Sequence, residues 1–254
     1  MAHPHRPPTA AGTADLTATR SGYDAMAGRY AEHFRTALED APLDRALLTG
    51  FAELVRRDHA DGPVIDAGSG PGRVTALLDR LGLTVRGIDL SPVMVELARR
   101  EHPGIDFQVG ELGALGAADT SLAGVVAWYS FIHIPAPRRP QVIGEFRRVL
   151  RPGGYLLLAF QIGDDTLHLD EAFGHQVSLD FHRLQPDAVV ALLDDAGFEV
   201  TARLVRAPEP AGAAAMVPQG FIIARSSRAT VSRPTAGART PSTRPAGTDL
   251  GSGP

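Results

Sequence analysis

The chain has 254 residues, 44% of them hydrophobic, which suffices for one large α/β domain with a substantial core but would crowd two full domains. It contains no cysteine, and all 25 basic residues are arginine. This composition excludes disulfides, thiolate metal sites, cysteine nucleophiles, P-loop lysines and Schiff-base lysines. The net charge is −4, but residues 23–225 alone carry −8, and such an acidic body disfavours a nucleic-acid partner.

Both ends of the chain are expected to be unstructured. Residues 1–15 have no apolar signal region, and residues 226–254 are rich in Ser, Thr, Pro, Gly and Arg and lack aromatic residues. Such segments bury too little apolar area to offset the entropy of ordering. No run of about 18 apolar residues occurs, so no membrane span is predicted. We therefore place the domain at residues 16–225 and expect a cytoplasmic protein.

Between these ends, short apolar runs alternate with helical patterns. Strands are predicted near Val64–Ala67, Thr84–Ile88, Asp106–Val109, Gly124–Tyr129, Tyr155–Gln161, Glu199–Val205 and Gln219–Arg225. Helices are predicted near Tyr23–Phe34, Leu43–Asp58, Arg73–Leu81, Pro92–Glu101, Pro137–Leu150 and Pro186–Ala196. The alternation indicates right-handed βαβ units and a mainly parallel sheet. The last two strands are joined without a crossover helix, so we expect them to pair antiparallel.

The strongest local pattern is the run PVIDAGSGPGRV at residues 63–74, where a buried strand meets a glycine turn and then a helix. Gly68, Gly70 and Gly72 let the backbone turn tightly and approach a ligand closely. The spacing is G-x-G-x-G, whereas dinucleotide binders have G-x-G-x-x-G. Asp66 ends the strand, and its carboxylate would repel a pyrophosphate but suits a cation. The sulfonium and ammonium groups of S-adenosylmethionine (SAM) meet that requirement; the alternative is a glycine turn without any ligand.

A second acid, Asp89, closes the next predicted strand in the run GIDLSPVM. In a doubly wound sheet, a carboxylate at this place can accept hydrogen bonds from both hydroxyls of a ribose. Ser91 and Pro92 follow as the cap and first residue of a helix. A helix-capping role alone is the other interpretation of Asp89. Because NAD enzymes also have an acid here, Asp89 indicates a nucleoside without identifying the cofactor.

These motifs resemble those of the class I SAM-dependent methyltransferases, and within them the small methyltransferase type 11 group. The resemblance covers about residues 23–225 and rests on the runs VIDAGSGPGRV, GIDLSPVMVELAR, FQVGELGAL, GVVAWYSFIHIP and LRPGGYLLLAF. It implies a doubly wound, Rossmann-like α/β fold whose seven-stranded, mainly parallel sheet has an antiparallel last strand. It also implies SAM as the cofactor and methyl transfer as the reaction.

The resemblance also implies site residues. Asp66 and the glycine loop would hold the methionine part of SAM, Asp89 the ribose, and Leu90 and Met94 the adenine. Glu111 would accept from the adenine amino group, although the family usually has the shorter Asp there. The complete expected cofactor set is Tyr23, Tyr30, Asp66, Gly68, Ser69, Gly70, Gly72, Arg73, Asp89, Leu90, Met94, Gly110, Glu111, Leu112 and Trp128. Core packing is the alternative for the two tyrosines.

Methyl transfer mostly requires that nucleophile, methyl carbon and sulfur be held in line in a dry pocket, with a base only where the acceptor must lose a proton. The candidates for that base are His133, after the fourth strand, and His168 and His175, in the long polar segment 161–183. That segment exceeds a normal strand–helix loop, which suggests a lid or acceptor wall. Its histidines lack an H-x-x-x-H pair, so no metal is expected.

The sequence therefore predicts a methyltransferase that acts on oxygen or nitrogen, or on carbon, of a small molecule such as a specialised metabolite. Neither nucleic acid nor membrane is expected as a partner, and a homodimer is left open. Two other classes remain. A SAM-binding protein that does not methylate, such as a cyclase or a pseudoenzyme, would have the same pocket. A NAD(P)-dependent oxidoreductase would need the G-x-G-x-x-G spacing and a lysine-assisted tyrosine, which are missing.

Overall fold

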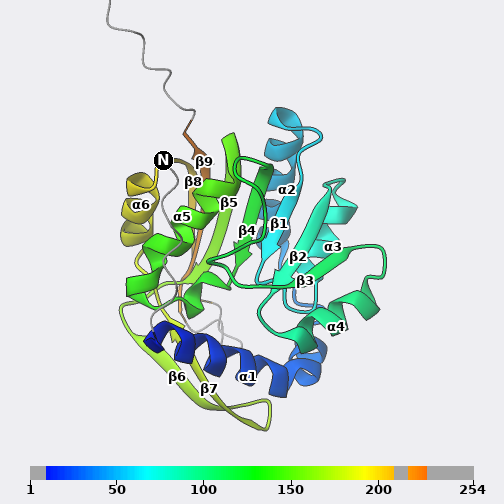
Figure 1. Cartoon of the computed structure of the whole chain (residues 1–254), viewed down its shortest axis with the longest axis vertical. Coiled ribbons are helices and arrows are strands. Elements are labelled where there is room, and N and C mark those ends of the chain that lie inside the picture. Colours follow the sequence, from blue (N-terminus) through cyan, green and yellow to red (C-terminus); the bar gives the residue numbers. More distant parts are fainter. Residues whose placement is uncertain (1–9, 209–216, 228–254) are drawn as a thin grey trace, which may run out of the picture.

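The computed structural model describes residues 10–208 and 217–227, which form a three-layered α/β domain (Figure 1). A seven-stranded sheet is the middle layer, in the order β3-β2-β1-β4-β5-β9-β8. Its strands are β1 (Val64–Ala67), β2 (Val85–Asp89), β3 (Asp106–Val109), β4 (Leu122–Trp128), β5 (Leu150–Gln161), β8 (Phe198–Arg206) and β9 (Gln219–Ser226). Strands β1 to β5 pair parallel, and β9 pairs antiparallel with β5 and β8. The predicted fold class is confirmed.

Helices cover both faces of this sheet (Figure 1). They are α1 (Ala10–His33), α2 (Pro42–Asp58), α3 (Arg73–Arg80), α4 (Pro92–Glu101), α5 (Arg139–Val149) and α6 (Pro186–Asp195), with short 3-10 helices η1 (Phe131–His133) and η2 (Ala136–Arg138). Among the residues that the structure describes, no helix combines the length and apolar character needed to cross a membrane.

Two hydrophobic clusters hold the layers together. One contains Phe51 of α2 and Val64 of β1, and the other contains Ile65 of β1 and Phe146 of α5. Successive residues of β1 belong to opposite clusters because side chains alternate between the two faces of a strand. Every residue of β1 is buried, as expected for a central parallel strand that is covered on both faces.

The strand order reverses between β1 and β4. At such a reversal the loops after the two strands diverge, and they leave a crevice outside the carboxyl ends of the sheet. The glycine loop follows β1 and the 3-10 helix η1 follows β4, so both flank this crevice. The fold thus brings the two segments with the strongest sequence patterns to one place.

A separate hairpin is the main departure from the sequence prediction. The segment after β5, which the sequence predicts as a long polar lid, contains the antiparallel strands β6 (Thr166–Ala172) and β7 (His175–His182). In Figure 1 the hairpin lies with α1 below the carboxyl ends of the strands. Gly22 permits this packing, since a Cβ there would lie 2.9 Å from Cδ2 of Leu179 on β7.

The chain ends differ in part from expectation. Helix α1 begins at Ala10, before the predicted domain boundary at residue 16, so residues 10–15 are helical. Strand β9 ends at Ser226, so the expected unstructured tail does not begin at that residue. The remaining terminal segments that were expected to be unstructured, 1–9 and 228–254, lie outside the described residues.

Candidate cofactor and acceptor site

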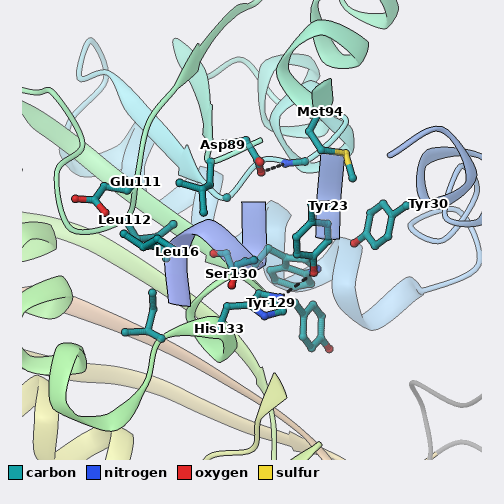
Figure 2. A pocket seen from close by; sticks show the side chains of 16 residues that line it. Leu16, Tyr23, Tyr30, Asp89, Met94, Glu111, Leu112, Tyr129, Ser130 and His133 are labelled. Atoms are coloured by element: carbon teal, nitrogen blue, oxygen red, sulfur yellow. Dashed lines mark hydrogen bonds between the residues drawn. The ribbon is translucent and has the colours of Figure 1, made fainter. Parts of the chain in front are cut away.

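Two adjoining cavities open at the crevice, and Figure 2 shows the larger one. The larger encloses about 700 Å³ including its mouth, and the smaller about 310 Å³. The larger is lined by Leu16, Thr19, Tyr23, Tyr30, Gly68, Gly70, Asp89, Leu90, Met94, Glu111, Leu112, Trp128, Tyr129, Ser130, His133 and Ile134. The smaller is lined by Tyr30, Asp66, Gly68, Ser69, Gly70, Pro71, Arg73, Val74 and Trp128. Because four residues line both, one ligand can span the two spaces.

The glycine loop depends on the absence of side chains. Gly68, Gly70 and Gly72 have φ angles of +80°, +53° and +87°, a region that other residues rarely adopt. A Cβ on Gly68 would lie 2.2 Å from Cβ of Ser130, whereas a Cβ on Gly70 would meet nothing within 4 Å. Gly68 therefore lets the loop approach the segment after β4. Gly70 lines both cavities, and its lack of a side chain leaves that space open to a ligand.

Asp66, at the end of β1, is a buried carboxyl group with half of its hydrogen-bonding capacity unused. The hydroxyl of Thr75 donates to Oδ2 at 2.7 Å. Within the described part of the chain, Oδ1 has no hydrogen-bond partner. Burial raises the pKa of Asp66 to about 7, because desolvation disfavours the charged form and the nearby Asp89 adds repulsion. The group is thus prepared for a cationic partner.

Asp89, at the end of β2, ties the glycine loop to the neighbouring strand. Its Oδ2 accepts from the backbone N–H of Gly70 at 2.7 Å, and its Oδ1 accepts from that of Ser91 at 2.9 Å. Burial raises the pKa of Asp89 to about 6, against the opposing effect of these hydrogen bonds. The carboxylate points into the larger cavity (Figure 2), where its remaining lone pairs can accept from a ligand.

Arg73, the first residue of α3, supplies the positive charge of the smaller cavity. Its Nη1 donates to the backbone carbonyl of Phe34 at 2.9 Å, and its guanidinium carbon lies 5.3 Å from the centre of the Phe34 ring. Among the described residues, its buried Nε has no hydrogen-bond partner. Arg73 and Asp66 therefore line one small space with opposite charges and an unused polar atom each.

Part of the wall of the larger cavity is apolar. Leu90, Met94 and Leu112 line it, and Met94 is fully buried. Glu111 also lines the cavity, beside Leu112 (Figure 2), and Nη2 of Arg138 is 3.4 Å from its Oε2. This arrangement of apolar walls beside one oriented carboxylate suits a flat heterocycle that carries an amino group.

A hydrogen-bonded chain joins three elements at the side of the larger cavity that faces the hairpin. Nδ1 of His133 lies 2.8 Å from the backbone carbonyl oxygen of Asp180, and Nε2 lies 2.8 Å from the hydroxyl of Tyr23. Because a carbonyl only accepts, Nδ1 carries the proton and Nε2 accepts from Tyr23. Burial lowers the pKa of His133 to about 4, so its ring is neutral at pH 7. Desolvation raises the pKa of Tyr23, which keeps its hydroxyl protonated.

The other two histidine candidates lie outside this cavity. His168 is exposed on β6 and interacts with Asp180 and Asp170, while His175 begins β7. Neither lines either cavity, so a catalytic role for them stays a prediction that the geometry does not favour. Among the described residues, no group of three His, Asp or Glu side chains could hold a metal ion.

Sequence reasoning missed several lining residues. Leu16 and Thr19 come from α1, upstream of the helix that the sequence predicted, and Ser130 and Ile134 follow β4. Tyr129 has a φ angle of +57°, an uncommon conformation for a bulky residue and one that recurs at functional sites. Tyr129 also lines the larger cavity.

Comparison with known proteins agrees with this geometry. Residues 64–154 match the family model described as a methyltransferase domain. The matched segment begins at β1 and contains the glycine loop, Asp89, Glu111 and the residues after β4. Over residues 64–154 the chain thus matches a methyltransferase domain.

Relatives of this methyltransferase domain include an uncharacterized methyltransferase of Oceanobacillus iheyensis, 30% identical over 48% of the chain and 55% of the relative. A ubiquinone biosynthesis O-methyltransferase of Xanthomonas oryzae pv. oryzae is 34% identical over 41% of the chain and 45% of the relative. The chain thus spans about half the length of these relatives. Among solved structures, the Burkholderia thailandensis 1,6-didemethyltoxoflavin-N1-methyltransferase superposes with a TM-score of 0.58 at 20% identity, over 88% of the chain and 94% of that protein.

Most residues that the sequence assigned to the cofactor line one of the two cavities of the methyltransferase domain. The exceptions are Gly72 and Gly110. Gly72 caps α3 with its positive φ angle, and the backbone N–H of Gly110 donates to the carbonyl of Asp89 at 2.9 Å. Both act on the shape of the site, and contact of any of these residues with a cofactor stays a prediction.

Proposed function

We propose that the protein transfers the methyl group of SAM to an oxygen or nitrogen atom of a neutral small molecule. Within the described part of the chain, three residues that line the smaller cavity each have a buried polar atom without a hydrogen-bond partner: Asp66, Ser69 and Arg73. The observation that carries this proposal is the oppositely charged pair among them, Oδ1 of Asp66 and Nε of Arg73. Buried polar atoms without partners are costly, so such a pair indicates a ligand that satisfies both. A zwitterionic amino acid does so, since its ammonium suits Asp66 and its carboxylate suits Arg73.

The remainder of the site fits an adenosine attached to that amino acid. The residues that would hold it are Asp89 at the ribose hydroxyls and Glu111 at the adenine amino group. Leu90, Met94 and Leu112 would pack on the base. The cofactor, when bound, supplies a methyl group on a cationic sulfur that a nucleophile can displace. A pyrophosphate, by contrast, would face the carboxyl of Asp66, which argues against a dinucleotide.

The remaining wall of the larger cavity is assigned to the acceptor. It is formed by Tyr23, Tyr129, His133 and Ile134, together with Leu16. The described lining of this cavity includes no arginine, and the chain has no lysine. An anionic acceptor would therefore have no cationic partner among the described lining residues, which favours a neutral and partly aromatic molecule. The acidic body supports a small molecule over a nucleic acid, and no membrane partner is proposed.

The part of His133 in the reaction follows from its tautomer. Its neutral Nε2 accepts a hydrogen bond from the hydroxyl of Tyr23. When this hydrogen bond breaks, Nε2 can receive a proton from the methyl acceptor instead. A pKa near 4 makes it a weak base, but an O–H or N–H proton becomes strongly acidic as its atom donates a lone pair to a carbon. A weak base suffices at that stage. Tyr23 and α1 keep water out, so the nucleophile stays aligned.

The direct test incubates the protein with methyl-labelled SAM and a panel of neutral phenols and N–H heterocycles, each paired with a carboxylated analogue. We expect label in the neutral compounds and formation of S-adenosylhomocysteine. Calorimetry should show SAM binding that Gly70→Val and Asp89→Ala each weaken at least tenfold while the fold is retained. Absence of SAM binding by the intact protein would refute the proposal. Binding without label transfer to any acceptor, including compounds from cell extract, would favour a SAM-binding protein of another function.

A further inference from the structure

The turn of the β6–β7 hairpin has an unusual residue at its first position. Ala172 pairs with His175, so Phe173 and Gly174 form a two-residue loop. Their φ angles are +53° and +78°, as in a type I′ turn. Asn, Asp or Gly normally occupies the first position, because positive φ is unfavourable for a bulky side chain. A residue held in such a conformation requires contacts elsewhere that stabilise it.

Those contacts come from the end of α1 and the residue after it. The ring of Phe173 lies 5.3 Å from that of His33, 6.0 Å from that of Tyr30 and 6.2 Å from that of Phe34, measured between ring centres. These distances and the inclined planes are typical of favourable aromatic pairs. The hairpin tip is therefore seated on the segment that precedes α2 rather than on the sheet.

Phe34 connects this aromatic cluster to the smaller cavity. Its carbonyl accepts from Nη1 of Arg73 at 2.9 Å, and its ring lies beneath the guanidinium at 5.3 Å. Tyr30, whose ring centre is 4.7 Å from that of Phe34, lines both cavities. A shift of Phe34 would thus move both its carbonyl and its ring, the two groups through which it contacts Arg73. The hydrogen bond and the ring together hold the guanidinium at the smaller cavity, which Arg73 lines.

We propose that Phe173 is a positioning residue for Arg73: by packing on Phe34 it holds the guanidinium where it binds the carboxylate of the cofactor. The inference rests on the proposed function, because Arg73 has this ligand only if SAM binds. It assigns to the hairpin, which otherwise covers the acceptor side, an effect on recognition of the amino-acid half of the cofactor. It also accounts for a strained phenylalanine at a turn where asparagine would be favoured.

The test compares two ligands on the full-length protein by calorimetry: S-adenosylhomocysteine and its decarboxylated analogue, which keeps the amine. Phe173→Asn creates the Asn-Gly sequence that a type I′ turn prefers, so the hairpin keeps its turn while the aromatic contacts are lost. We expect this variant to bind S-adenosylhomocysteine about five- to tenfold more weakly and the decarboxylated analogue with unchanged affinity. Phe173→Tyr should bind both as the native protein does. Gln176→Ala, an exposed change on the same hairpin, should alter neither affinity.

A double-mutant cycle with Arg73→Met tests whether Phe173 affects ligand binding through Arg73. If Phe173 acts through Arg73, Phe173→Asn should weaken binding of S-adenosylhomocysteine no further in the Arg73→Met background. Phe173→Leu provides a second variant should the asparagine protein fail to fold. Equal loss for both ligands, or no loss, would overturn the positioning role and leave the proposed function intact. Failure of the native protein to bind S-adenosylhomocysteine at all would overturn both.

Discussion

At the residue scale, the buried carboxyl of Asp66 combines a cost in stability with the binding role proposed for it. Its folded-state pKa of about 7 lies well above the ordinary value, so folding keeps the proton on this group. Its contribution to stability is therefore greatest below the ordinary pKa and is lost as the pH rises through about 7. Without a ligand, the protein at pH 8 carries a buried charge on Asp66 whose Oδ1 has no hydrogen-bond partner among the described residues.

We therefore expect Asp66→Asn to stabilise the ligand-free protein at pH 8, by roughly 1–3 kcal/mol, because the amide needs no charge compensation. Thr75 can still donate to the amide oxygen. The gain should shrink at pH 5, where Asp66 of the native protein is protonated, and binding of SAM should be lost at both pH values. Urea unfolding at pH 5 and pH 8 measures the difference. A variant less stable than the native protein at pH 8 would contradict this account of Asp66.

The same group predicts a pH dependence of binding. Between pH 6 and pH 8 the carboxyl of Asp66 changes from mostly protonated to mostly ionised, whereas an α-amino group of the cofactor stays largely cationic. Affinity for S-adenosylhomocysteine should therefore rise about tenfold over this range. Calorimetry at several pH values tests this, with 5′-methylthioadenosine, which lacks the amino acid, as the control. A flat profile for S-adenosylhomocysteine, or an equal rise for both ligands, would show that Asp66 does not bind the ammonium.

At the element scale, α1 and the β6–β7 hairpin pack closely on each other at Gly22 and Leu179, and together they cover the crevice. Three successive residues of α1 contact three elements: Gly22 faces Leu179 on β7, Tyr23 reaches His133, and Asp24 accepts from the hydroxyl of Ser91 at 2.5 Å. Successive helical residues point about 100° apart, which lets one turn join three neighbours. The position of this cover therefore depends on the contacts of the helical turn that contains Gly22, Tyr23 and Asp24.

Gly22→Val is expected to lift α1 from β7, because its side chain would overlap that of the fully buried Leu179. Overpacking of this kind costs about 1–3 kcal/mol of stability, and it should also lower kcat for methyl transfer by admitting water. Thermal unfolding and steady-state kinetics measure both effects. Gly28→Val, on the same helix with open space around it, is the control and should leave kcat unchanged. Equal kcat values for both variants would show that closure does not depend on this contact.

Local sequence patterns predicted the strands and helices that form the proposed cofactor site. The parallel sheet places their ends side by side. Periodicity and the glycine loop place Asp66 and Asp89 at strand ends, and parallel strands align those ends. The contact of Tyr23 with His133 joins residues 110 positions apart, so no local pattern could reveal it. Strand β7 of the hairpin does have a local pattern, because Val177, Leu179 and Phe181 alternate with polar residues as in a half-buried strand.

At the scale of the whole molecule, the reversal of strand order between β1 and β4 determines where ligands bind. The first half of the sheet brings carboxylates to that edge, and η1, after β4, brings His133. The cover formed by α1 and the hairpin lies over the same edge (Figure 1). One crevice thus contains both the residues proposed to bind the cofactor and the wall proposed to face the acceptor.

The crystal structure of the protein with S-adenosylhomocysteine tests this account most directly. It should show the amine of the ligand within hydrogen-bonding distance of Oδ1 of Asp66, the carboxylate at Arg73 and the ribose hydroxyls on Asp89. A ligand bound elsewhere, or in the crevice with its amino-acid half away from Asp66 and Arg73, would contradict it.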